Sequence, residues 1–194
     1  ASASSEDSGW TAWQPFAKVG DATKRWQAAN YSTVSPYTYS GAVTTTDINS
    51  VVYSGEWLQI QLPVTVTLSS YTLQSYGGIF GQSKWWLFGS TNGTTWTLVD
   101  SRSSITWSGS APATAQTFTV SGVQGSYSYF RLVVNQSNGA TVTTVCQLIL
   151  NASTTISFWP GGIMTGYTTT INGTYTASAS SEDSGWTAWQ PFAK

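Results

Sequence analysis

The side chains of this sequence that could do chemistry are few, and they do not form a catalytic set. The chain has no histidine, and its single cysteine, Cys146, lies in an apolar run that predicts a buried side chain. The acidic pair Glu6 and Asp7 returns as Glu182 and Asp183. Neighbouring residues of an extended strand face opposite sides, so such a pair is poorly placed for acid–base catalysis. We therefore expect a protein that is not an enzyme.

The two ends of the sequence are identical: residues 1–18 return without one change as residues 177–194. Diverged repeats within a folded domain would have drifted at solvent-facing positions. We interpret the chain as one full period of a tandem array plus an overlap, and an engineered terminal duplication is the alternative. This interpretation predicts a domain at 1–158, a linker and opening strand at 159–176, and the start of the next repeat at 177–194.

A tandem array also predicts contacts between successive repeats. The C-terminal aromatic residues repeat Trp10, Trp13 and Phe16, so in an array they would fill the core of the next unit, while the serines before them join a sheet edge. A Trp-Pro-Gly-Gly stretch would form the hinge. The expected inter-repeat contact residues are Trp159, Pro160, Ser178, Ala179, Ser180, Trp186, Trp189 and Phe192.

The composition of the chain limits the kinds of partner that we expect it to bind. Charged residues make up 8% of the chain and the formal net charge is −1. No stripe of Lys and Arg could replace phosphate counterions, which argues against a nucleic-acid partner. No apolar run is long enough to cross a bilayer, so we expect no membrane insertion. Because little charge repulsion separates the copies, the main expected partner is another copy of the same repeat.

Five Asn-x-Ser/Thr sequons predict N-glycosylation and a location outside the cell or on a cell or virion surface. Sugars would give a neutral, aromatic-rich fibre a hydrated coat. One of the five also lies in an Asn-Gly turn, where a purely structural role is the alternative. The candidate glycosylation sites are Asn30, Asn92, Asn135, Asn151 and Asn172.

Period-two patterns predict strands along most of the chain. In residues 56–62 the apolar side chains alternate with Trp and Gln, and Pro63 is expected to end that strand. Only residues 19–30 suit a short helical turn. Further strands are expected at 65–76, 85–90, 94–100, 116–120, 127–135 and 142–150. We expect an all-β fold, an antiparallel β-sandwich or jelly roll. Its predicted inward residues are Leu58, Ile60, Leu73, Leu87, Phe118, Leu132 and Leu148.

Several of these segments resemble a known family. The stretches 55–63 (GEWLQIQLP), 88–99 (FGSTNGTTWTLV) and 127–133 (YSYFRLV) resemble the central strand, a hairpin and a late strand of discoidin, or coagulation factor 5/8 type C, domains. Residues 14–26 match a further segment of that family loosely. Residues 172–181 resemble the opening of tandem repeats in surface proteins of marine protists and large algal viruses. The resemblance implies the galactose-binding-like jelly roll.

Members of that family often bind sugars through loops at one end of the sandwich. The resemblance makes Trp10, Trp13, Trp107 and Tyr37 candidates for glycan stacking, because the CH-rich face of a pyranose fits the π face of an aromatic ring. The alternative is that these rings pack in the core or at a contact between repeats.

Family members also often hold a structural calcium ion. Here Ala17 and Lys18 stand where an Asp-Gly turn would fall, and Gln147 stands near a late acidic position, which leaves Asp21 as a weak candidate ligand. Calcium prefers several oxygen ligands that include carboxylates. We therefore expect no bound metal and no other cofactor.

Two functions follow from these patterns. The duplication and the neutral composition favour a structural repeat unit of an extracellular glycosylated filament or surface fibre, joined head to tail. The family resemblance favours the alternative, a glycan-binding adhesion module in a multidomain cell-surface or virion protein, with carbohydrate as a partner.

Overall fold

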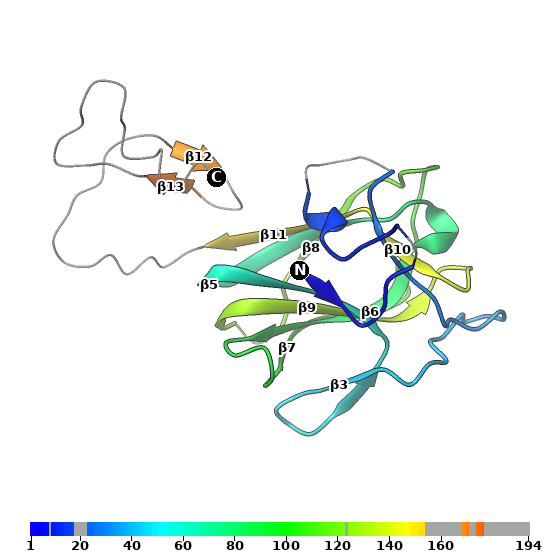
Figure 1. Cartoon of the computed structure of the whole chain (residues 1–194), viewed down its shortest axis with the longest axis horizontal. Coiled ribbons are helices and arrows are strands. Elements are labelled where there is room, and N and C mark those ends of the chain that lie inside the picture. The colour runs from blue at the N-terminus through cyan, green and yellow to red at the C-terminus, as the bar shows by residue number, and fades with distance from the viewer. Residues whose placement is uncertain (8, 18–22, 123, 154–167, 171–173, 177–194) are drawn as a thin grey trace, which may run out of the picture.

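A computed structural model describes residues 1–153, 168–170 and 174–176 of the chain, except residues 8, 18–22 and 123. The main sheet contains β1 (Ser2–Ala3), β5 (Glu56–Gln74), β6 (Gln82–Ser90), β7 (Thr97–Arg102), β8 (Gln116–Thr119), β9 (Ser126–Ser137) and β11 (Gln147–Ser153). Its strand order is β1-β5-β9-β6-β7, and β8 and β11 also pair with β5. All these pairings are antiparallel, and together they form the predicted β-sandwich (Figure 1).

Three smaller antiparallel pairs complete the described strands. They join β2 (Trp26–Ala28) to β10 (Thr143–Val145), β3 (Thr44–Thr46) to β4 (Val52–Ser54), and β12 (Thr168–Thr170) to β13 (Thr174–Thr176). The linker residues Trp159 and Pro160 and the whole of 177–194 lie outside the described residues, so the predicted contacts between repeats stay predictions.

Strand β5 belongs to both layers of the sandwich. It pairs with β9 at residues 56–61 and again at 66–67, and its second half pairs with β8 and β11. The register with β9 shifts between Gln61 and Val66. Pro63 lies in this irregular, exposed part, where its missing N–H removes no ladder bond. The prediction that Pro63 ends the strand is therefore wrong: the strand passes through the proline from one layer to the other.

The alternating pattern correctly gave the inner face of the sheet. Leu58, Leu132 and Leu87 lie side by side on neighbouring strands, and none of the three is accessible to solvent. Of the seven predicted inward residues, Leu58, Leu73, Leu87, Phe118, Leu132 and Leu148 are buried, and Ile60 is partly buried against the core. Cys146 is buried as well, which agrees with its apolar surroundings in the sequence.

The outer face of the same sheet carries a second apolar cluster. Trp57 and Trp86 flank Val133 on this face, and the register places Arg131 next to them, between Gln59 and Phe88. Trp85, by contrast, is completely buried on the inner face, so the two adjacent tryptophans face opposite sides as their strand position predicts.

Arg131 pairs within the fold, as expected from the sequence. Its guanidinium lies 4.2 Å from the Trp57 ring centroid and 4.1 Å from that of Trp96. It donates hydrogen bonds to Gln59 Oε1 at 3.0 and 2.8 Å and to Thr45 Oγ1 at 3.1 Å. Burial lowers the pKa of Arg131 to about 10. This arginine thus ties the β3–β4 hairpin to the outer face of the sheet.

Helical structure is limited to two short 3₁₀ turns, η1 (Gln14–Phe16) and η2 (Gly78–Phe80), in the described part of the chain. The expectation of a helical turn within 19–30 is wrong for its described residues, because Trp26–Ala28 pairs with Thr143–Val145 as strand β2. The strand expected at 142–150 divides at Cys146, whose N–H donates to the Gln74 carbonyl at 2.8 Å.

The inner-face rows predict where the fold is sensitive to mutation. Leu132→Ala leaves a cavity in the centre of β9, and we expect a loss of about 2–5 kcal/mol in the free energy of unfolding. Val64→Ala is the matched control: Val64 is 40% exposed in the irregular part of β5, and a change within about 0.5 kcal/mol is expected. Urea denaturation monitored by tryptophan fluorescence measures both. Equal losses for the two variants would contradict the packing described here.

Candidate functional site

One end of the sandwich gathers loops from four parts of the sequence (Figure 1). The loop between β5 and β6 contains η2, and it is fixed to the loop between β9 and β10 by Asn138, whose N–H donates to the Gly81 carbonyl at 2.8 Å. The Asn138 side chain adds a bond from Nδ2 to the Gly78 carbonyl at 3.0 Å. Residues 4–7 and 9–17 lie at the same end, where Asp7 and Trp10 form backbone hydrogen bonds with Gln27 of β2. Loops held in this way can present side chains in a fixed arrangement.

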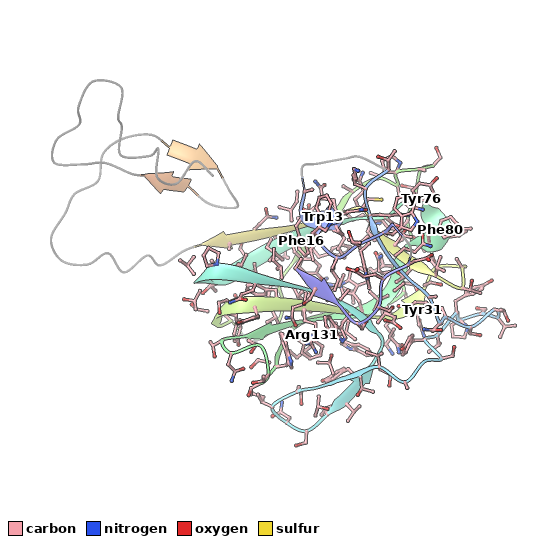
Figure 2. All side chains as sticks on the ribbon, viewed as in Figure 1. Trp13, Phe16, Tyr31, Tyr76, Phe80 and Arg131 are labelled. Atoms are coloured by element: carbon pink, nitrogen blue, oxygen red, sulfur yellow. The ribbon has the colours of Figure 1, made fainter. Side chains whose placement is uncertain are left out.

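An arginine contacts two aromatic rings at this end. The Arg25 guanidinium is 3.5 Å from the Trp10 ring centroid and 4.2 Å from that of Tyr76. The Tyr76 ring in turn lies 5.9 Å from the Phe80 ring, centroid to centroid. All four side chains are partly buried, and Figure 2 shows Tyr76 and Phe80 together at this end of the molecule. We call Trp10, Arg25, Tyr76 and Phe80 the Arg25 cluster.

Hydrogen bonds from residues 7–14 and β2 position this cluster. The Arg25 N–H donates to Gln14 Oε1 at 2.8 Å, and its side-chain Nε donates to Gln27 Oε1 at 3.2 Å. Gln27 Nε2 donates to Asp7 Oδ2 at 2.6 Å, and the Gln27 N–H donates to the Trp10 carbonyl at 3.4 Å. The side chain of Gln27 thereby connects the guanidinium with the exposed carboxylate of Asp7.

This arrangement combines apolar and polar recognition groups. Cation–π contacts hold the Arg25 guanidinium near the rings of Trp10 and Tyr76, and its Nε donates to Gln27. The rings of Trp10, Tyr76 and Phe80 offer apolar surface, and Gln27 and Asp7 offer polar groups beside it. Aromatic faces next to a few placed polar groups suit a ligand that has both CH surface and hydroxyl or carboxylate groups.

The four glycan-stacking candidates predicted from sequence do not form one site. Trp10 belongs to the Arg25 cluster. Trp13 is 55% exposed, and Figure 2 shows it with Phe16, away from Tyr76. Tyr37 is partly buried in a turn of its own, with a positive φ of 54°.

Trp107 requires a correction. It is only 7% exposed, and its Nε1 donates to the Gln82 carbonyl at 2.9 Å. Its indole fills the space beside Gly81, where an added Cβ would lie 2.1 Å from the ring. Trp107 is therefore a core residue that closes the end of the sandwich, and it offers no ring face for stacking with a sugar.

Sequence reasoning missed Arg25, Tyr76 and Phe80 as site residues. Their contacts with Trp10 join positions far apart in the chain, and no local pattern marks them. The one available signal is that Arg25 precedes the buried Trp26, so that in an extended strand its side chain faces the opposite way from the core.

The sequons lie in different environments. Asn30 and Asn92 are exposed, Asn151 is partly buried with Nδ2 donating to Ser70 Oγ at 3.1 Å, and Asn172 is outside the described residues. The prediction of a glycan at Asn135 is not supported by its surroundings. Asn135 is 8% exposed, and its Nδ2 donates to the Ser54 carbonyl at 2.9 Å. A glycan on that nitrogen would have no room in the folded protein, because the side chain is buried.

The described residues do not fit the calcium site of the resembling family. No three His, Cys, Asp or Glu side chains gather closely enough in the described part to hold a metal ion. Gln147 is 5% exposed and carries a neutral amide where a carboxylate would be needed. Asp21, the weak candidate, lies outside the described residues.

Within the part of the chain that the structure describes, no helix is long and apolar enough to span a membrane.

Solved structures of carbohydrate-binding modules share this fold. A pectin-binding carbohydrate-binding module matches with a TM-score of 0.53 at 15% identity, over 79% of this chain and 90% of that chain. The CBM32 module of AlyQ, solved with 4,5-unsaturated mannuronic acid, matches with a TM-score of 0.52 at 15% identity, over 76% of this chain and 89% of that chain.

A family 89 glycoside hydrolase from Clostridium perfringens also matches, with a TM-score of 0.53 at 14% identity. The match covers 85% of this chain but 15% of that enzyme. Neither a family model nor a curated protein sequence matches the chain. At these identities the comparisons establish the fold, a β-sandwich of the galactose-binding-like type, and they leave the narrower resemblance to factor 5/8 type C and viral or protist repeats as a prediction.

The exposure of the sequons predicts which of them are used. In material secreted by a eukaryotic host, we expect N-glycans at Asn30 and Asn92 and none at Asn135. Peptide mass spectrometry before and after enzymatic deglycosylation measures occupancy at each position. Asn92→Gln is the control that should remove one glycan mass. A glycan on Asn135 in protein that retains its fold would contradict the assignment of that side chain.

Proposed function

We propose that this chain is a non-catalytic carbohydrate-binding module that binds a glycan at the Arg25 cluster. The observation that carries the proposal is that the Arg25 guanidinium contacts both Trp10 and Tyr76, at 3.5 and 4.2 Å from their ring centroids. The fold shared with carbohydrate-binding modules supports it. This function was the alternative derived from the sequence, and the structural neighbours favour it over the filament.

The charge at the cluster favours an acidic glycan. The positive charge of Arg25 attracts a carboxylate. A uronic acid carries such a carboxylate, and its CH groups suit the rings of Tyr76 and Phe80. Two of the solved structures with this fold are described as a pectin-binding module and as a complex with an unsaturated mannuronic acid.

A structural role in a filament is the second candidate. The observation in its favour is the identity of residues 1–18 and 177–194, which suits an array of repeats joined end to end. Such an array would display many copies of a weak glycan site, and the combined affinity would rise without any new contact. Both candidates imply a location outside the cell or on its surface.

Substitutions in the Arg25 cluster test the glycan site. Arg25 and Tyr76 are suitable because they lie outside the duplicated segments, whereas Trp10 is repeated as Trp186. We expect Arg25→Ala and Tyr76→Ala each to weaken binding of oligogalacturonate or alginate oligosaccharides about tenfold or more. Arg25→Lys keeps the charge but loses the planar fork, and we expect it to weaken binding as well. Isothermal titration calorimetry measures the dissociation constants.

Lys84→Ala is the matched control, because Lys84 also lies over a ring, 5.2 Å from the Trp86 centroid, outside the Arg25 cluster. The Lys84→Ala variant should bind the oligosaccharides with the affinity of the wild type. Circular dichroism should show that all variants keep the fold. A chain that binds neither the acidic oligosaccharides nor neutral or chitosan oligosaccharides would overturn the proposal. Binding that survives in both alanine variants would place the site elsewhere.

A further inference from the structure

The N-terminal segment contacts the rest of the domain as a peptide ligand would. Strand β1 pairs with the edge of β5, with Ser2 opposite Gln59 and Ala3 opposite Leu58. The ladder continues where the Ser4 N–H donates to the Trp57 carbonyl at 3.0 Å. The segment thereby protects an edge of the main sheet that would otherwise be open to pairing.

Two serines of the segment satisfy a buried carboxylate. Ser4 Oγ and Ser5 Oγ donate to Glu56 Oε2 at 2.5 and 2.7 Å, and Glu56 is only 1% exposed. The Ser5 carbonyl accepts a bond from Trp26 Nε1 at 2.9 Å. These contacts are specific to the side chains of the segment, since a buried carboxylate needs its donors in place.

The second half of the segment folds over β2. The Asp7 N–H donates to the Gln27 carbonyl at 3.1 Å, and Gln14 accepts from the Arg25 N–H. Ala12 is 2% exposed inside the core cluster, and its N–H donates to Glu6 Oε1 at 2.6 Å. The segment therefore binds one continuous surface, formed by residues 25–28 and 56–59, which we call the acceptor surface.

Residues 177–194 carry every group that makes these contacts, in the same order. Ser178, Ala179, Ser180 and Ser181 repeat residues 2–5, and Ala188 repeats Ala12. Each chain thus has one acceptor surface and two segments with the sequence that binds it. We propose that the acceptor surface is also the binding site for residues 177–194 of a second copy of this chain, which joins copies head to tail.

The covalent connection decides which segment occupies the surface. Exchange of one segment for an identical one leaves the contacts unchanged, as in domain swapping. Residues 1–17 are joined to β2 by a short stretch that begins at residue 18, so their effective concentration at their own surface is high. Each chain also carries the second segment, which would bind a neighbour whose own first segment is disabled. The proposal does not depend on glycan binding.

The duplicated sequence allows the same substitution to be made in either segment. An acceptor chain carries Ala12→Asp and Ala188→Asp, which put an unpaired carboxylate at the buried position of both segments. The donor is the wild-type chain, whose second segment is intact. The control donor carries Ala188→Asp alone and differs from the wild type at that one position. Each donor is mixed with the acceptor and examined by sedimentation velocity.

We expect a one-to-one complex with the wild-type donor and none with the Ala188→Asp donor. No complex with either donor, or equal complex with both, overturns the proposal. If the doubly substituted acceptor does not fold, the folding and the oligomeric state of the chain with Ala12→Asp alone test the proposal. Folded oligomers that grow with protein concentration support the proposal. A chain as unfolded as the double variant overturns it, and so does a folded monomer at every concentration, because its own second segment then fills the surface.

Discussion

The buried carboxylate of Glu56 is the interaction on which the loop end of the sandwich depends. Burial of a charge is costly unless hydrogen bonds replace the lost water. Here Ser4, Ser5 and Tyr39 donate to it at 2.5, 2.7 and 3.0 Å, and Asn30 Nδ2 lies at 3.4 Å. These donors come from the N-terminal segment and from the loop after β2. One acid at the start of β5 therefore fixes two segments that have no strand ladder between them.

The position of the N-terminal segment then sets the geometry of the Arg25 cluster. With Ser4 and Ser5 held at Glu56, the chain crosses β2 and places Trp10 against Arg25. Tyr76 reaches the guanidinium from the loop between β5 and β6, which follows the second half of the same long strand. The passage of β5 between the two layers thus brings the acid that anchors the segment and the ring that completes the cluster into one structure.

The sequence determined the sandwich because its signals are local. Alternation in β5, β6 and β9 separates Leu58, Leu87 and Leu132 from Trp57 and Trp86, and period two alone assigns the faces. The passage through Pro63 was missed, since only the pairing shows that the proline lies where the ladder is interrupted.

Most residues of the candidate site could not be predicted from local sequence patterns. Trp10 was named for the nature of its side chain, but its partners Arg25 and Tyr76 are set by tertiary contacts. The same limit explains Trp107 and Asn135: a tryptophan and a sequon look alike in sequence whether they are exposed or buried. Trp107 fills the space that Gly81 leaves, and Asn135 closes onto the Ser54 carbonyl.

The segment that docks at Glu56 also supplies an essential part of the proposed glycan site. Trp10 is one of the two rings that hold the Arg25 guanidinium, and Gln14 and Asp7 help to position that arginine. A segment from a second copy would bring Trp186 in the place of Trp10, because the two sequences are identical. An empty acceptor surface would leave Arg25 stacked on Tyr76 alone. The proposed glycan site and the proposed joining of copies would therefore both depend on the N-terminal sequence and its copy, and both would require an occupied acceptor surface.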